Sequence, residues 1–223
     1  MKLYTYCIPV DDGAAPNPYF GVCTLAICKP AIRRTAEIGD WIVGVGSKNV
    51  NDIDFSGKIV YAMKVTDKMT YAEYNVYCQR ELKEKIPDLK HADYNRKVGD
   101  CVYDDADKNN IFQRASVHGP NNIDTDKGGK HVLLSDYFFY FGDKAISIPP
   151  HLTPIIHQTQ SHKVHLNELY KNEFVQWIEN IDYPQNTLIG NPQITLPFDD
   201  AGKINKCATK RNDWGIEDEK GIC

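Results

Sequence analysis

The sequence lacks the long apolar runs that a membrane helix requires. Its apolar runs are short, such as Val132–Leu134, whereas a membrane span needs about 20 apolar residues. Behind Lys2 there is neither a long apolar stretch nor a small-residue cleavage site, so we expect no signal peptide. The apolar fraction of 42% and the charged fraction of 25% are ordinary globular values. These features predict a soluble cytoplasmic protein that does not contact a membrane.

A strong basic excess is also missing. The net charge of the 223 residues is −4, which argues against electrostatic wrapping of duplex DNA, because such binding needs a large basic surface. A local basic cleft remains compatible with this charge. The seven cysteines are irregularly spaced and include no C-x-x-C pair. This predicts reduced thiols and not a secreted disulfide framework.

Several signatures of catalysis and metal binding are absent. The chain has no GxxxxGK[ST] P-loop, no G-x-S-x-G elbow and no H-E-x-x-H motif. Three histidines lie close together in His157–His165, but in an extended segment His162 would point away from the other two. We therefore expect no metal and no cofactor, and a polar loop that contacts a phosphate or a base is an equal alternative for this segment.

Strand-like segments outnumber helical ones and do not alternate with them regularly. Residue patterns predict strands at Lys2–Val10, Cys23–Lys29, Trp41–Val45, Lys58–Val65, Cys101–Tyr103 and His131–Phe141, the last with a bend near Ser135. Helices are predicted at Ala31–Ala36, Tyr71–Lys85 and Leu166–Ile181, and a long surface loop at Asn109–Lys130. This order predicts an α+β fold: a small, mostly antiparallel, curved sheet or open β-barrel with flanking helices. We expect one domain over residues 1–200, helical in its C-terminal portion, and a polar tail over residues 201–223.

The segment Asp11–Lys48 is the first candidate site, because cations lie there close to small polar groups and aromatic rings. Tyr19 and Trp41 are candidates for stacking on a base. Candidates for phosphate binding and for hydrogen bonds to a base edge are Asn17, Thr24, Lys29, Arg33, Arg34, Ser47 and Lys48. For any single residue the alternative, a solvated arginine or a core tryptophan, is the more common one, whereas the segment as a whole favours a site.

Gln113–His118 is the second candidate site. In a polar loop, Gln113 and Ser116 are suited to base edges, and His118 is suited to proton transfer, since histidine titrates near neutral pH. A cysteine nucleophile, Cys23 or Cys28, paired with the distant His118 is a further possibility, because such pairs meet only in space. Asp11 is a candidate acid or base. The common alternatives are a solvated histidine and an inert buried cysteine.

The stretch Ala15–Lys48 (APNPYFGVCTLAICKPAIRRTAEIGDWIVGVGSK) resembles a bacterial and phage family, the second of the nucleotide modification associated domains. The resemblance continues through Gly99–Tyr103, Ser116–His118 and Leu133–Gly142. It implies association with enzymes that modify DNA bases or nucleotides. A helix, a GD turn and a strand over Ala31–Gly46 are also similar to PUA-type barrels of the ASCH and EVE groups, which hold a modified or flipped base in an aromatic pocket.

Three functions follow as hypotheses. The first is recognition of a nucleotide or modified base in DNA modification or phage–host conflict, with an aromatic and cationic pocket. The second is an enzyme that completes a base or nucleotide modification, with Asp11, Cys23, Cys28 and His118 as candidate catalytic groups. The third is a non-catalytic subunit of a modification or bacterial defence complex. The expected partners are a nucleotide or a nucleic acid with a modified base, and for the third hypothesis a protein; the sequence does not indicate the oligomeric state.

Overall fold

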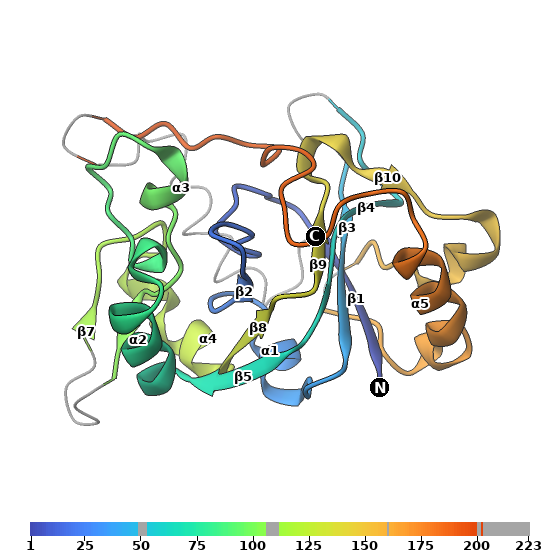
Figure 1. Ribbon diagram of the computed structural model, residues 1–223, viewed down its shortest axis with the longest axis horizontal. Coiled ribbons are helices and arrows are strands. Elements are labelled where there is room, and N and C mark those ends of the chain that lie inside the picture. The colour runs from blue at the N-terminus through green and yellow to red at the C-terminus, as the bar shows by residue number, and fades with distance from the viewer. Residues whose placement is uncertain (49–52, 106–111, 160, 200–201, 203–223) are drawn as a thin grey trace.

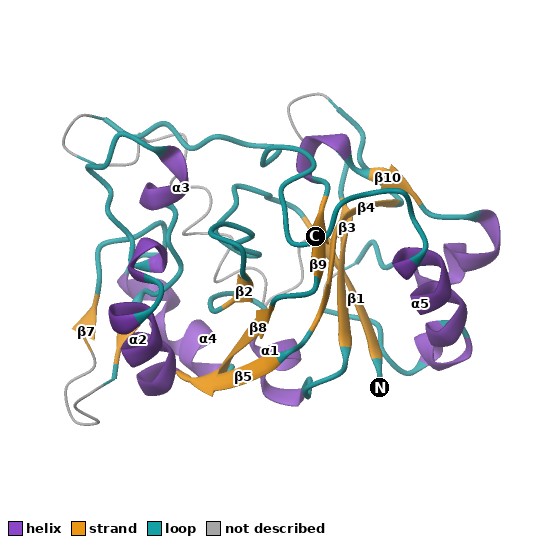
Figure 2. Cartoon of the chain, viewed as in Figure 1, coloured by secondary structure: helices purple, strands orange, loops and turns teal. Residues whose placement is uncertain are grey.

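The computed structural model describes residues 1–48, 53–105, 112–159, 161–199 and 202. Within these ranges the chain forms an α+β fold whose strands lie centrally, with α2 at one end of the molecule and α5 at the other (Figures 1 and 2). The predicted fold class is confirmed: the pairings are mostly antiparallel, and the sheets do not close into a barrel.

The larger sheet has the strand order β1-β3-β4-β10, with β9 also paired to β4. Strand β1 pairs with β3 in parallel, and the pairs of β4 with β3, β9 and β10 are antiparallel. Every residue of β1 and β3 is buried, as expected for strands covered on both faces. The strand bounds are β1 Leu3–Ile8, β3 Trp41–Gly46, β4 Lys58–Lys64, β9 Phe138–Tyr140 and β10 Ile146–Ser147.

The smaller sheet has the order β2-β8-β5, with β8 in the centre. Strand β8 passes into β9 through the bend that was predicted near Ser135, so that one stretch of chain contributes to both sheets. The strand bounds are β2 Cys23–Leu25, β5 Asp67–Thr70 and β8 His131–Ser135; β6 (Tyr103–Asp104) and β7 (Phe112–Gln113) form a separate pair.

Helices cover the sheets from several sides. The predicted helices near Ala31 and Tyr71 are confirmed, although the second ends at Arg80; a 3-10 turn, Lys83–Lys85, follows it and carries the Lys85 ammonium into the core. Helix α5 packs Phe174 and Ile178 against the face of the larger sheet that carries Trp41. The helix bounds are α1 Pro30–Thr35, α2 Tyr71–Arg80, α3 Tyr94–Lys97, α4 Ile123–Gly128 and α5 Lys171–Glu179.

Two predictions about loops and helices are wrong. The predicted loop Asn109–Lys130 contains β7, a 3-10 turn and helix α4 in its described part. The helix predicted from Leu166 begins as a 3-10 turn, and Leu166 and Leu169 are 70% and 82% exposed and do not face the core.

The predicted polar tail lies outside the described residues except for Gly202. Within the described ranges, none of the helices combines the length and the apolar character needed to cross a membrane.

Candidate functional site

Cys28 lies on a sharp turn between β2 and α1. The predicted strand Cys23–Lys29 is wrong in its second half, because β2 ends at Leu25. Cys28 and Lys29 both adopt left-handed backbone conformations, with φ of 59° and 41°, which are uncommon for residues with a side chain. Pro30 then begins α1, where a fixed φ and a missing N–H are tolerated. The turn holds the half-buried Cys28 thiol at the edge of a pocket.

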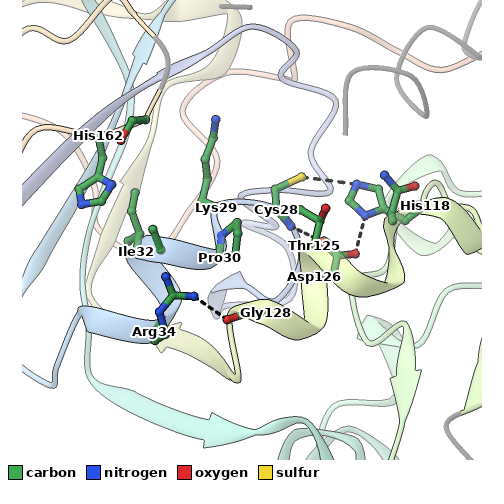
Figure 3. A pocket seen from close by; sticks show the side chains of 13 residues that line it. Cys28, Lys29, Pro30, Ile32, Arg34, His118, Thr125, Asp126, Gly128 and His162 are labelled. Carbon is green, nitrogen blue, oxygen red and sulfur yellow. Dashed lines mark hydrogen bonds and ion pairs between the residues drawn. The ribbon is translucent and has the colours of Figure 1, made fainter. Parts of the chain in front are cut away.

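The turn places Cys28 next to two residues from a distant part of the chain. Cys28 Sγ lies 3.4 Å from His118 Nε2, and His118 Nδ1 lies 2.6 Å from Asp126 Oδ2 (Figure 3). The Cys28 N–H donates to the other carboxylate oxygen of Asp126 at 2.7 Å. The three side chains therefore form a Cys–His–Asp constellation, in which a thiol faces an imidazole that a carboxylate orients.

The charges of the constellation support an ionised His118–Asp126 pair. Burial by itself lowers the pKa of His118, but the Asp126 carboxylate and the Cys28 thiol outweigh it and hold the pKa well above its usual range. Burial likewise acts to raise the pKa of Asp126, and the opposite charge of His118 lowers it overall. The geometry therefore places an imidazole, oriented by a carboxylate, within 3.4 Å of the Cys28 sulfur.

The sequence did not single out Asp126, because it lies in the stretch that was predicted as a loop. It sits on the six-residue helix α4 and also accepts a hydrogen bond from Tyr103 at 2.8 Å. Pro120 before this helix and the Gly128–Gly129 pair at its end are helix start and stop signals that could have found it. An acidic residue eight positions after a candidate histidine was the remaining clue.

Arg33 binds the two halves of the constellation together. This fully buried side chain donates to Cys28 O at 2.6 Å, His131 O at 2.9 Å and Asp126 O at 2.6 Å. A fourth bond, of 2.5 Å, goes to the hydroxyl of Tyr71. Gly129 leaves room for this arrangement, since a Cβ at that position would overlap the guanidinium group. Arg33, a predicted phosphate ligand, thus has four of its donors directed to internal acceptors.

Gln113 and Ser116 hold the loop that carries His118. The Gln113 amide donates to His118 O at 3.1 Å and to Gly119 O at 3.0 Å. The Ser116 hydroxyl donates to His118 O and accepts from the His118 N–H. Both residues were predicted to contact a base edge, and in the structure they position His118.

The constellation opens on a pocket of about 360 Å³, within the usual size range of small-molecule sites. Cationic, apolar and polar side chains are all present in its wall. Lys29 and Arg34 lie on the α1 side, and Arg34 also donates to Gly128 O at 2.8 Å. The full lining is Cys28, Lys29, Pro30, Ala31, Ile32, Arg34, His118, Asn122, Thr125, Asp126, Gly128, Ser161 and His162.

His162 brings the predicted histidine-rich segment to this pocket. Its ring lies 5.6 Å from that of Tyr4. Burial lowers the pKa of His162, and the charges of His157, His165 and Lys29 act in the same direction. These influences together favour the neutral form of the His162 imidazole. Among the described residues no cluster of three His, Cys, Asp or Glu side chains has a metal-binding arrangement.

Two of the predicted catalytic residues lie elsewhere. Cys23 is fully buried within β2, and burial raises the pKa of its thiol to about 12, which is typical of an unreactive cysteine. Asp11 is buried and accepts a hydrogen bond of 2.8 Å from the hydroxyl of Tyr140. Neither residue belongs to the lining of the Cys28 pocket.

Asn17 and Thr24 belong to a buried polar network around Lys85. The Lys85 ammonium, which is fully buried, donates to Asn17 Oδ1 at 2.6 Å and to Thr24 Oγ1 at 3.0 Å. Thr24 in turn donates to Asp100, as does Tyr74 at 2.7 Å. Burial is the main influence on both charges: it lowers the pKa of Lys85 and raises that of Asp100.

The remaining predicted ligand-binding residues also lie away from the pocket lining. Trp41 is fully buried between Tyr137 and Phe174, so its ring has no face open to a base. Tyr19 is 6% exposed and packs in the core around α2. Ser47 and Lys48 follow β3 at the opposite end of that strand from α1.

The fold and the site define an α+β protein with a Cys–His–Asp constellation in the wall of a small pocket. The family described as nucleotide modification associated domain 2 matches residues 1–198. The chain belongs to this family, which confirms the resemblance in the sequence and supports an association with nucleotide modification. Comparison with curated proteins and with solved structures finds no match.

Proposed function

We propose that the chain is an enzyme that uses Cys28 as a nucleophile on a nucleotide or on a base-modified derivative of one. The observation that carries this proposal is the pair of contacts at His118, 3.4 Å to Cys28 Sγ and 2.6 Å to Asp126, at the wall of a pocket. Many buried cysteines are inert; a cysteine beside an oriented imidazole and an open cavity has the arrangement of an activated nucleophile.

Each member of the constellation has a distinct role in this proposal. His118 holds at Nε2 the proton that the Cys28 thiol gives up, and the thiolate forms a bond to an electrophilic carbon of the substrate. Asp126 orients His118 through Nδ1 and stabilises its imidazolium form. His118 then gives the Nε2 proton to the leaving group and so acts as the general acid.

The pocket suits a single nucleotide better than duplex DNA. A volume of about 360 Å³ accommodates a small molecule, while the net charge of −4 does not favour wrapping of a duplex. Pro30 and Ala31 offer apolar contact to a base or sugar, and Lys29 and Arg34 offer positive charge to a phosphate. Together with the family membership, this composition supports a nucleotide as the substrate class.

Alkylation of Cys28 by iodoacetamide tests the nucleophile without knowledge of the substrate. We expect wild-type Cys28, followed by peptide mass spectrometry, to react at least about 100-fold faster near neutral pH than Cys28 in His118→Gln. His151→Gln is the matched control, because His151 is exposed and outside the pocket, and it should react like the wild type. Equal rates in the wild type and His118→Gln would refute the proposed nucleophile.

Calorimetry with deoxynucleoside monophosphates tests the substrate class. The Cys28→Ser variant binds without turnover, and Arg34→Gln in that background should weaken binding about tenfold or more, the effect of losing a charged hydrogen bond. Arg80→Gln, an exposed change on α2, is the control. If no monophosphate binds while the corresponding nucleosides do, the assignment of Lys29 and Arg34 to a phosphate is wrong.

A further inference from the structure

Asn122 belongs to the lining of the Cys28 pocket and lies, in sequence, midway between the two residues that activate Cys28. It ends the 3-10 turn Pro120–Asn122 and caps helix α4, four residues after His118 and four before Asp126. Residues four apart share a helix face, and both Asn122 and Asp126 belong to the pocket lining. The side chain is nevertheless only 1% exposed.

The amide of Asn122 has one bonded end and one unpaired end. Its Oδ1 accepts a hydrogen bond of 3.0 Å from the Gly119 N–H, and this donor fixes which end of the amide is oxygen. Its Nδ2 is buried and has no hydrogen-bond partner among the described residues. A buried donor without an acceptor costs about 1–3 kcal/mol, so such a group calls for a functional explanation.

We propose that Asn122 Nδ2 donates to the oxygen of a carbonyl group whose carbon is attacked by Cys28. This inference rests on the proposed function and narrows it: the substrate is a nucleotide derivative with an acyl-type electrophile, such as an amide, an ester or a ring carbonyl. Asn122 is then a catalytic residue that binds the oxyanion. A donor fixed in a buried site stabilises this developing charge strongly, because it is already oriented before the reaction begins.

The electrons and protons of the step balance without a further reactant. The Cys28 thiolate forms a C–S bond, and the π pair of the carbonyl moves to the oxygen that Asn122 binds. Collapse of this intermediate re-forms the carbonyl and breaks the bond to the leaving group, which takes the proton from His118 Nε2. Attack of water or an acceptor hydroxyl or amine on the resulting thioester, with loss of its proton to His118, releases the product and regenerates the thiolate.

Two small probes separate the role of Asn122 from that of Cys28. Acylation of Cys28 by p-nitrophenyl acetate passes through an oxyanion, whereas alkylation by iodoacetamide is a direct displacement at carbon and does not. We expect Asn122→Ala to lower the acylation rate about 10²–10³-fold, the effect of removing an oxyanion donor elsewhere, with the alkylation rate unchanged. Asn121→Ala is the matched control, since Asn121 is the exposed neighbour of the same type.

A second variant separates the loss of the donor from a disturbed conformation of the loop. Asn122→Asp keeps an acceptor for the Gly119 N–H and removes the donor, so the ratio of acylation to alkylation should fall in both variants. The oxyanion role would be overturned if the ratio of acylation to alkylation did not change in the variants, whether or not both rates fell. It would also be overturned if wild-type Cys28 were alkylated but never acylated; in both cases the assignment of Cys28 as the nucleophile would still hold. Slow alkylation of wild type, at the rate of His118→Gln, would instead refute the proposed function itself.

Discussion

Replacement of Arg33 by methionine is the most informative perturbation of the fold around the site. The change keeps the length and apolar character of the side chain and removes every donor. Two backbone carbonyls, those of Cys28 and His131, lose the hydrogen bonds of 2.6 and 2.9 Å that Arg33 provides. The Asp126 carbonyl keeps its bond of 2.6 Å from the Tyr71 hydroxyl.

The cost of this change follows from the two orphaned acceptors. Both carbonyls are part-buried, and the loss of a hydrogen bond from a charged donor costs about 1.5–3 kcal/mol at each, or about 3–6 kcal/mol together. Removal of a buried charge acts in the opposite direction, so we expect a net loss of about 2–4 kcal/mol in the free energy of unfolding. For a chain of this size, that loss lowers Tm by roughly 4–16 °C.

Arg33 also differs from a residue that only stabilises the fold, because it holds the backbones of Cys28 and Asp126 in one arrangement. In the folded fraction of Arg33→Met, we expect alkylation of Cys28 to slow by roughly 10–100-fold, the effect of a displacement of about 1 Å. Arg33→Lys keeps the charge but not the planar set of donors, so it should restore less of the Cys28 reactivity than of the stability.

Urea unfolding and mass-spectrometric alkylation are the two measurements. Arg80→Met is the control, because Arg80 is exposed on α2 and lies outside the pocket lining; both measurements should resemble the wild type. If Arg33→Met unfolds like the wild type, or if its folded form is alkylated at the wild-type rate, the positioning role of Arg33 is wrong.

Three further results are expected. The stability lost in Asp126→Asn should be greatest between about pH 4 and 6.5. The lowered pKa of Asp126 stabilises the fold above the ordinary Asp pKa, and this contribution is lost as pH falls; the raised pKa of His118 stabilises the fold below the ordinary His pKa, and this contribution is lost as pH rises. A stability difference between variant and wild type that stays constant across pH in denaturant titrations would contradict this prediction. Lys85→Met removes the donor to Asn17 and Thr24 and the cation near the buried Asp100, and it should cost about 3–5 kcal/mol in urea unfolding. Lys85→Met with Asp100→Asn should recover part of this loss; a double variant as unstable as the single one would show that the charges are not coupled. Trp41→Ala should cost about 3–5 kcal/mol as a core truncation, while the milder Trp41→Phe should bind deoxynucleoside monophosphates with wild-type affinity, and weaker binding by that folded variant would restore the stacking hypothesis.

The strands were predictable because their residue types report local preference and burial directly. Trp41–Val45 and Lys58–Val65 are compact apolar runs in the sequence and buried strands in the structure. Helix α4 was not predictable in this way, since its six residues, IDTDKG, are mostly polar. Tertiary contacts hold it, above all the bonds from Arg33 and His118 to Asp126.

The candidate site was predictable in part for a similar reason. Cys28 and His118 were named as one possible pair, but they are 90 positions apart and no spacing in the sequence selects His118 for Cys28. Arg33 and Arg34 could not be told apart, because adjacent residues on a short helix point in different directions and only the packing decides which one is buried. Arg33 turns toward α4, and Arg34 remains exposed.

Gly129 sets a limit on how the chain can vary. Any side chain at this position would compete with the Arg33 guanidinium for the same space, and the displaced arginine would release both Cys28 and α4. A residue outside the pocket lining should therefore tolerate substitution as poorly as an active-site residue does. If all twenty residues were tested at position 129, glycine should be required for Cys28 reactivity as strictly as cysteine is required at position 28. In a related chain that has lost one of these two residues, we expect the other to be lost as well.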